Sequence, residues 1–492
     1  MTILKFKEEP VGKVISVDTG TVVVDILDVE KLKTLQVNRL VAITSGNPQQ
    51  HLIGIIQKIT RKLDSSTVNE SPLTGLVSEQ EPILSDINLV KIALIGTFYD
   101  VHRGVGNVFK RSIHTVPDIE AYCYCIEEEK LTQFMEAIAK SSDSDSNALL
   151  LGHYTLDEHA RAFINGDRFF QRHALVVGST GSGKSWTVAK ILEQVSKLDS
   201  GCSVIFDLHG EYSNIKLDGV GQYKIASPKD AQNNKGLSEG VIYTPYWLLR
   251  YEDMIDILVD ASDNNAHNQA SVVSSLVRRA KEFYLKSNKI NVDFTVDSPI
   301  PYHIEGDVSE IETDDVTGEI SGDVSGILAA LKVLNVGRDR SSSAAGRAGP
   351  YNGKFDRLIP RLENKISDKR LSFLFSRTTE TMSYDYIVEL SKCLMYSGGA
   401  EKVKIINFSE VPSDILPLIT SLIARIVFEV QQWTLKDNRH PVSIFCDEAH
   451  LYIPNAVLGG IEGSSLKLFE RIAKEGRKYG VSLVIVSQRP SE

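Results

Sequence analysis

The segment GSTGSGKS, residues 178–185, combines glycines, a lysine and serines at the spacing of a phosphate-binding loop. Its glycines let the backbone curl so that successive N–H groups face a phosphate at the start of a helix. We expect Lys184 to neutralise the β- and γ-phosphate oxygens of ATP, and Ser185 to ligate Mg²⁺. The nucleotide-binding residues that this motif predicts are Gly178, Ser179, Thr180, Gly181, Ser182, Gly183, Lys184, Ser185 and Trp186.

An acidic pair follows an apolar run in VSIFCDEAH, residues 442–450. A strand that ends at Asp447 places this carboxylate beside the magnesium ion, and Glu448 lies where it can polarise an attacking water. A solvated acidic pair at a strand end is the alternative interpretation, and the phosphate loop favours the catalytic one. We therefore expect Lys184 and Glu448 to be catalytic, and Ser185 and Asp447 to be metal ligands.

The tetrapeptide DEAH also names a class of helicases. A helicase of that class carries two successive RecA-like lobes, and the second lobe supplies the arginines that complete the site. Only 492 − 448 = 44 residues follow Glu448 in this sequence, too few for a second lobe. We therefore expect a single lobe that takes its completing arginine from a neighbouring copy, in a ring or filament.

Continuous apolar runs predict the strands that position these motifs. One run precedes the phosphate loop, and others occur at 202–208, 402–408, 442–447 and 481–487. Runs of this kind, without alternation, are typical of a parallel sheet covered on both faces. The long stretch between the second and third runs has mainly helical periodicity, so we interpret it as an insertion.

The N-terminal part of the chain is expected to form a small β-barrel, because short β-branched runs alternate with turn residues at 11–27 and 39–61. The predicted fold class is α/β: a RecA-like P-loop ATPase core with a parallel sheet, an N-terminal small β-barrel and an inserted helical subdomain. The expected domains are the barrel at 1–110, a helical connector and linker at 111–150, and the ATPase domain at 151–492 with the helical insertion at about 215–400.

The amino-acid composition limits the classes to which the protein can belong. Of 492 residues, 42% are hydrophobic and 24% are charged, as in soluble globular proteins of two to four domains. Five scattered cysteines without a CxxC pair favour a reducing cytoplasm over a zinc site or disulfide framework. No apolar h-region follows the N-terminal residues MTILKFKEEP, so we expect no secretory signal. The apolar segment 414–430 contains Arg425 and is too short to span a bilayer. We expect a cytoplasmic protein with no membrane partner, in which 414–430 is a buried core helix.

Four motifs together resemble a known family. They are RHALVVGSTGSGKS (172–185), IFDLHGEY (205–212), CDEAHLYIP (446–454) and EGRKYGVSLVIVSQRPSE (475–492). In this order, with a large helical insertion between the second and third, they closely resemble the HerA family of the HerA–FtsK ATPases. The resemblance is specific over the ATPase core and loose over the barrel. It implies a homo-hexamer that uses ATP and Mg²⁺ to move double-stranded DNA through its channel. Relatives usually continue past the last motif, with elements that brace the adjacent subunit.

The same resemblance implies roles for further residues. Gln488 corresponds to the sensor that hydrogen-bonds the γ-phosphate or its water, and Arg477 to the finger inserted into the neighbour's site. Arg172 is similar to a second arginine near the nucleotide. For both arginines an ordinary surface position is the alternative. In the second motif, Asp207, His209 and Glu211 are expected at a strand end where parallel sheets place ligands, and for His209 a role in the core is the alternative.

Two segments are candidates for contact with DNA. The glycine-rich loop 455–467 follows the acidic pair, where nucleotide state could move it against a channel. The loop 337–350 carries Arg338, Arg340 and Arg347, and a disordered surface loop is the favoured interpretation of it. The net charge of −10 counts against nucleic-acid binding by the whole surface, although a ring can be basic along its channel alone.

Two functions follow from these observations. The first is a motor that moves double-stranded DNA for a partner enzyme, in anti-phage defence or DNA end processing. The partner is a NurA-like nuclease or a sirtuin-like or other effector enzyme, because the sequence shows no nuclease signature of its own. The second is an ATP-stabilised ring that serves as a platform for the assembly and activation of such an effector.

Overall fold

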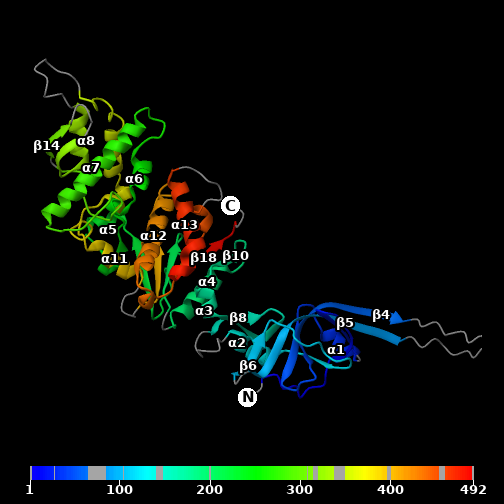
Figure 1. Ribbon diagram of the computed structural model, residues 1–492. Helices are drawn as coiled ribbons and strands as arrows, with labels where there is room; N and C mark the ends of the chain where they lie inside the picture. The colour runs from blue at the N-terminus through cyan, green and yellow to red at the C-terminus, as the bar shows by residue number, and fades with distance from the viewer. Residues whose placement is uncertain are drawn as a thin grey trace, which may run out of the picture. The chain divides into compact units, whose positions relative to one another are not determined.

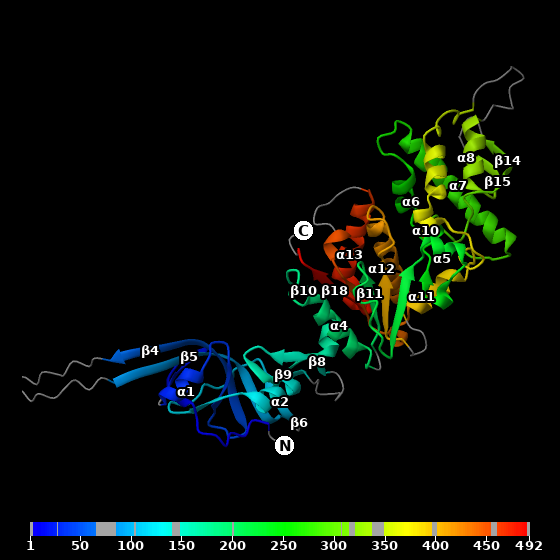
Figure 2. The same cartoon turned by 180° about the vertical axis from the view of Figure 1, so that it is seen from behind.

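The computed structural model describes residues 3–26, 28–64, 85–102, 105–139, 148–198, 201–306, 308–313, 320–336, 349–395, 401–453 and 460–489. The chain forms two compact units, Met1–Arg168 and Phe169–Glu492 (Figure 1 and, from behind, Figure 2). The division falls within helix α3 (Gly166–Phe170), later than the expected boundary near residue 150.

The hairpin of β8 (Ala148–Tyr154) and β9 (Asp157–Asn165) explains this later boundary. It packs against helix α2 (Glu128–Ala139) of the first unit, where the Thr132 hydroxyl accepts the Arg161 backbone N–H at 2.9 Å. The hairpin therefore belongs to the N-terminal unit. The polar segment 141–147, which was expected to be a linker, lies outside the described residues.

Six antiparallel strands of the described N-terminal unit close the small β-barrel that the sequence predicts. Their order is β2-β1-β7-β3-β4-β5, and β5 pairs back to β2. The strands are β1 (Gly12–Val17), β2 (Thr21–Asp25), β3 (Leu40–Thr44), β4 (Gln50–Asp64), β5 (Ser85–His102) and β7 (Tyr122–Cys125), and β6 (Val105–Lys110) extends the sheet beyond β5. Helix α1 (Val29–Thr34) is capped by Asp28. Because β7 completes the barrel, the barrel continues past its expected end at residue 110.

The second unit contains a parallel sheet of seven strands within its described residues. Their spatial order is β10-β18-β17-β11-β16-β12-β13. The strands are β10 (Ala174–Val177), β11 (Ser203–Asp207), β12 (Val220–Ile225), β13 (Val241–Ile242), β16 (Val403–Asn407), β17 (Val442–Cys446) and β18 (Val481–Ser487). Because all are parallel, their carboxyl ends share one edge of the sheet, where ligands bind in this class of fold.

Side chains alternate between the two faces of the sheet along each strand, and both faces are buried. Val204, Ile444 and Leu483 point into the large core that includes α12 (Leu416–Trp433) and α13 (Gly460–Tyr479). Their neighbours Ile205 and Phe445 face the other side and are fully buried as well. Helix α4 (Lys184–Val195) follows β10 directly. The expectation of a sheet covered on both faces is confirmed, and the fold class is α/β.

The insertion is smaller than the expected range of about 215–400. Strands β12 and β13 lie inside that range but belong to the parallel sheet, because β12 pairs with β16 from Val220↔Val403 to Lys224↔Asn407. In its described residues the insertion is mainly helical, and β14 (Val308–Thr313) pairs antiparallel with β15 (Ile320–Val324). The α-helices described between β12 and β16 are α5 (Pro228–Gln232), α6 (Tyr251–Leu258), α7 (Ala266–Ser287), α8 (Ile327–Val336), α9 (Leu358–Ser367), α10 (Ser372–Phe375) and α11 (Tyr386–Leu394).

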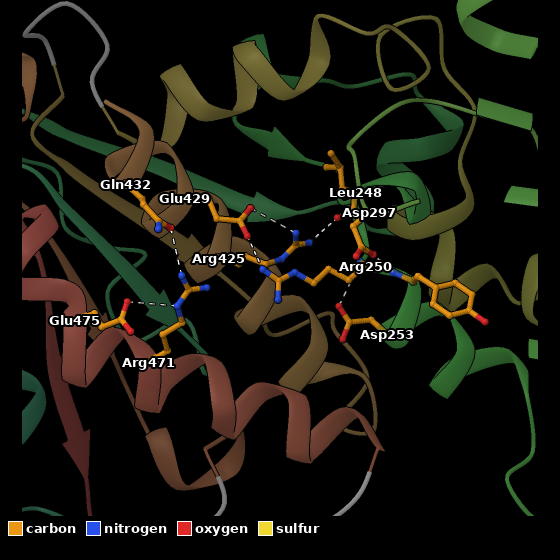
Figure 3. A network of polar contacts seen from close by, with 10 residues as sticks. Leu248, Arg250, Asp253, Asp297, Arg425, Glu429, Gln432, Arg471 and Glu475 are labelled. Carbon is orange, nitrogen blue, oxygen red and sulfur yellow. Dashed lines mark hydrogen bonds and ion pairs between the residues drawn. The ribbon is translucent and has the colours of Figure 1, made fainter. Parts of the chain in front are cut away.

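Helix α12 is the buried core helix that the apolar segment 414–430 predicts, and Figure 3 shows how it accommodates Arg425. The buried guanidinium donates to the Leu248 carbonyl at 2.6 Å and lies 3.7 Å from Glu429. Glu429 also binds Arg250, at 2.5 Å. The charge on this apolar helix is therefore used to attach the insertion to the core. No helix among the described residues is long and apolar enough to cross a membrane.

Candidate nucleotide-binding site

The phosphate loop occupies the turn between β10 and α4. Gly181 and Gly183 have φ angles of 78° and 93°, in the left-handed region that disfavours residues with a side chain. Gly183 is the N-cap of α4 and supplies no side-chain cap, which leaves the first N–H groups of the helix directed at the loop. A Cβ on Gly178 would meet the Ser182 hydroxyl at 2.3 Å. The glycines therefore give the loop the curled backbone that a phosphate group requires.

The side chains of this loop differ in what they contact. The Lys184 ammonium lies 3.5 Å from the Ser179 carbonyl, so it folds back over the loop. Ser185 is partly buried, whereas the Trp186 side chain is 83% exposed. Trp186 therefore contributes nothing to the core, and its role in nucleotide binding stays a prediction.

The acidic pair follows β17, in the middle of the sheet. Asp447 and Glu448 are both buried, with 4% and 7% of their surface exposed. Burial and the neighbouring carboxylates of Glu448 and Glu211 raise the pKa of Asp447 to about 7. The solvated alternative for this pair is wrong, because both side chains are buried.

Tyr212, at the end of the DLHGEY motif, connects the phosphate loop to the acidic pair. Its side chain is buried. Burial raises the pKa of its hydroxyl, as do the carboxylates of Asp447 and Glu211, and the nearby Ser185 side chain opposes this rise. The Tyr212 hydroxyl has no hydrogen-bond partner of suitable geometry among the described residues. The hydroxyl therefore lies close to both predicted metal ligands, Ser185 and Asp447. Sequence reasoning did not single out Tyr212, and the only signal was an aromatic residue next to an acidic motif.

The other residues of DLHGEY have separate roles. Asp207 is fully buried and accepts the backbone N–H groups of Glu211 at 3.0 Å and Tyr212 at 3.1 Å. Burial raises the pKa of Asp207, and these N–H groups oppose the rise. Asp207 thus folds the turn that presents Tyr212. Both Glu211 and His209 are exposed, so a core role for His209 is wrong.

Gln488 follows β18 and joins the two halves of the site. Its amide oxygen accepts the Thr180 hydroxyl at 2.6 Å, and its amide nitrogen donates to Glu448 Oε1 at 2.5 Å. The other carboxylate oxygen, Glu448 Oε2, lies 3.3 Å from His450 Nδ1 without the geometry of a hydrogen bond. His450 Nδ1 also lies 3.5 Å from the Ser487 hydroxyl. Neither the contact of Thr180 with Gln488 nor the position of His450 was predicted from the sequence.

The two predicted arginines make no hydrogen bond or ion pair with this cluster of described residues. Arg477 is in the last turn of α13 and Arg172 precedes β10, and both are exposed. Neither side chain makes an ion pair or a hydrogen bond with another residue in the described part of the chain. Their roles stay predictions.

The segments expected to contact DNA are only partly described. In the loop 455–467, residues 455–459 lie outside the described residues and the remainder begins α13. Arg338, Arg340 and Arg347 also lie outside the described residues.

Residues 149–427 match the model of a protein family described as "Helicase HerA, central domain". The chain belongs to the HerA helicase family. The matched range contains the phosphate loop, the DLHGEY motif and the insertion, and it ends before the acidic pair. The predicted membership of the HerA family is thereby confirmed, and the first two of the four motifs lie within the matched range.

Individual relatives of this HerA-family chain are distant. The DNA double-strand break repair helicase HerA of Pyrococcus furiosus is 23% identical over 380 residues, which are 73% of this chain and 61% of that protein. Its namesake in Saccharolobus solfataricus is 25% identical over 332 residues, 65% of this chain and 51% of the relative. The chain therefore spans about half to three fifths of the length of these relatives.

Two solved structures show a weak likeness to this HerA-family chain. The plasmid coupling protein TrwB in complex with ADP and Mg²⁺ has a TM-score of 0.39 and 14% identity, over 74% of this chain and 70% of that structure. VirB4 of Thermoanaerobacter pseudethanolicus has a TM-score of 0.38 and 14% identity, over 70% of this chain and 78% of the other.

Proposed function

We propose that this chain is the motor subunit of a cytoplasmic, homo-hexameric translocase that hydrolyses ATP to move double-stranded DNA. The observation that carries the proposal is the meeting of Thr180, Glu448 and Gln488 at the carboxyl edge of the sheet. Gln488, after β18, bridges the phosphate loop and the acidic pair through these two hydrogen bonds, and this gathers at one edge of the sheet the groups that hydrolysis of a γ-phosphate requires. The two HerA relatives are DNA double-strand break repair helicases, which supports DNA as the substrate.

The residues of the site suit hydrolysis. Glu448 accepts a proton from the attacking water, whose oxygen forms a bond to the γ-phosphorus. The bond from that phosphorus to the bridging oxygen breaks, and ADP and inorganic phosphate leave. Lys184 and the N–H groups at the start of α4 stabilise the charge on the phosphate oxygens during this step.

The site also fits Mg²⁺. Asp447 lies among the carboxylates of Glu448, Glu211 and Asp207, and the charge they place together is what raises its pKa beyond the effect of burial. A divalent cation would relieve this repulsion, with Ser185 and Asp447 as its protein ligands; when bound, Mg²⁺ neutralises phosphate charge. Within the described residues, no three His, Cys, Asp or Glu side chains form a metal cage. A cation held by few protein ligands, with water and phosphate completing its shell, is typical of Mg²⁺.

Arg477 supports assembly into a ring. Its side chain is exposed at the end of α13, and none of the described residues pairs with it. We infer that it enters the site of the adjacent subunit, where it stabilises the transferring phosphoryl group. The resemblance to the HerA family supports a place for Arg172 near the nucleotide, as a second arginine.

DNA cleavage or another effector reaction is assigned to a separate enzyme, a NurA-like nuclease or a sirtuin-like effector. Such a pair would serve anti-phage defence or DNA end processing. The second candidate function is a ring that binds ATP to hold its shape and activates that effector without moving DNA. The net charge of −10 favours it, because DNA phosphates require a basic partner surface.

ATP hydrolysis with and without duplex DNA distinguishes the motor from the platform. A motor predicts that duplex DNA accelerates phosphate release by about tenfold or more, an amount equivalent to about 1.4 kcal/mol of barrier. The Glu448→Gln variant is the control, since its hydrolysis should not respond to DNA. No acceleration, together with effector activity that survives Glu448→Gln, would support the platform instead.

A further inference from the structure

The Gln488 amide is engaged at both ends. The amide nitrogen of Gln488 donates to Glu448 Oε1, at 2.5 Å. The amide oxygen then faces Thr180, whose hydroxyl must act as the donor, at 2.6 Å. The orientation of the amide is thus fixed by its partners.

Glu448 is not free to act as a base in this arrangement. Its Oε1 accepts the Gln488 amide, and its Oε2 is shielded from solvent. A general base needs a lone pair open to the water whose proton it accepts. Gln488 therefore occupies Oε1, and the buried Oε2 is closed to solvent.

We propose that Thr180 is a positioning residue that holds Gln488 on Glu448 in competition with the γ-phosphate of bound ATP. This inference rests on the proposed ATPase function. A γ-phosphate oxygen is an acceptor that competes with Glu448 for the Gln488 amide nitrogen. When the amide turns to the phosphate, Glu448 Oε1 becomes available to water. The Thr180 hydroxyl stabilises the resting arrangement, and so restrains hydrolysis.

The geometry distinguishes this role from simple support of the loop. The Thr180 side chain is exposed, and its hydroxyl bonds a residue 308 positions away in the sequence. Thr187, in the first turn of α4, instead makes a local hydrogen bond: its hydroxyl donates to the Gly183 carbonyl at 3.0 Å. The two threonines therefore form a matched pair, one bridging to Gln488 and one local.

The test compares kcat and KM for ATP in the absence of DNA. Thr180→Val keeps the shape of the side chain and removes the donor, so kcat should rise about fivefold, the value of one hydrogen bond, with KM changing less. Thr180→Ala is a second variant expected to do the same, and Thr180→Ser should restore the restraint. Thr187→Val is the control and should leave kcat unchanged. In a Gln488→Ala background, Thr180→Val should have no effect on kcat.

An unchanged or lower kcat in both Thr180→Val and Thr180→Ala would overturn the inference. So would an equal rise in Thr187→Val. The proposed function fails separately, if hydrolysis by the wild-type chain does not depend on Lys184 and Glu448.

Discussion

Gln488 and Glu448 are joined by a hydrogen bond of 2.5 Å although 40 residues separate them in the sequence. They meet because β17 and β18 are parallel neighbours, paired from Val442↔Val481 to Cys446↔Ile485, so that the residues after each strand share one edge of the sheet. Strand β10 lies on the other side of β18 and brings the phosphate loop to the same edge. The order of these three strands therefore builds the site.

Removal of the Lys184 ammonium should abolish ATP hydrolysis. Lys184→Ala loses the charge that neutralises the phosphate oxygens, and kcat/KM should fall by about a hundredfold or more. Lys190→Ala is the matched control, because Lys190 lies on the same helix but pairs with Glu193 at 2.9 Å. Phosphate release and calorimetric titration with ATP measure the two variants. Equal activities in both would contradict the assignment of the loop.

Glu448→Gln should separate binding from hydrolysis. The variant keeps the shape of the side chain but loses the base, so kcat should fall by about a hundredfold to ten-thousandfold. Nucleotide affinity should stay within a few-fold of wild type, because the phosphate loop is untouched. ATP retained on the purified variant, measured by chromatography after denaturation, checks the prediction. A variant that hydrolyses ATP at the wild-type rate would exclude Glu448 as the base.

The insertion should show a pH dependence that comes from Lys281. This lysine of α7 is buried, and its ammonium donates to the Val296 and Ser298 carbonyls, both at 2.6 Å. Burial lowers its pKa from 10.5 to about 8, opposed by Asp297. Because the folded-state pKa is the lower one, the charged lysine costs stability fully below about pH 8, and this cost is relieved as the pH rises from 8 to 10.5.

Thermal unfolding of wild type and Lys281→Met at pH 7.5 and pH 9.5 tests this sign. The melting temperature of wild type should rise relative to that of the variant as the pH increases. Lys286→Met is the control, because Lys286 is an exposed lysine of the same helix, 3.0 Å from Glu282. Melting temperatures that change in parallel for all three proteins would show that the Lys281 pKa is not lowered.

The parts of the site with local sequence signals were predictable. The glycines of the phosphate loop and the acidic pair after β17 are recognisable because each works through backbone geometry or charge within a few residues. The apolar runs predicted the central strands for the same reason, since burial on both faces demands continuous apolar residues.

Features that depend on distant partners were not predictable. Strand β13 has only two residues, Val241 and Ile242, and is a strand only because β12 lies beside it. The short strand β7 completes the barrel through pairing with β1 and β3. The contact between Thr180 and Gln488 could be predicted only by knowing that β10 pairs with β18. The sequence around each of these two residues does not indicate the other. These elements gain their structure from tertiary pairing that outweighs local propensity.

Two inactive variants, tested singly and mixed, give the most direct measurement of a site shared between subunits. Arg477→Ala keeps its own phosphate loop and lacks the finger, whereas Lys184→Ala keeps the finger and lacks a working loop. Each alone should hydrolyse ATP poorly. If the ring assembles at random from a 1:1 mixture, about a quarter of its interfaces join an intact loop to an intact finger, and about a quarter of wild-type hydrolysis should return. Hydrolysis that stays at the level of the separate variants, in rings shown to contain both, would contradict a site completed by the neighbouring copy.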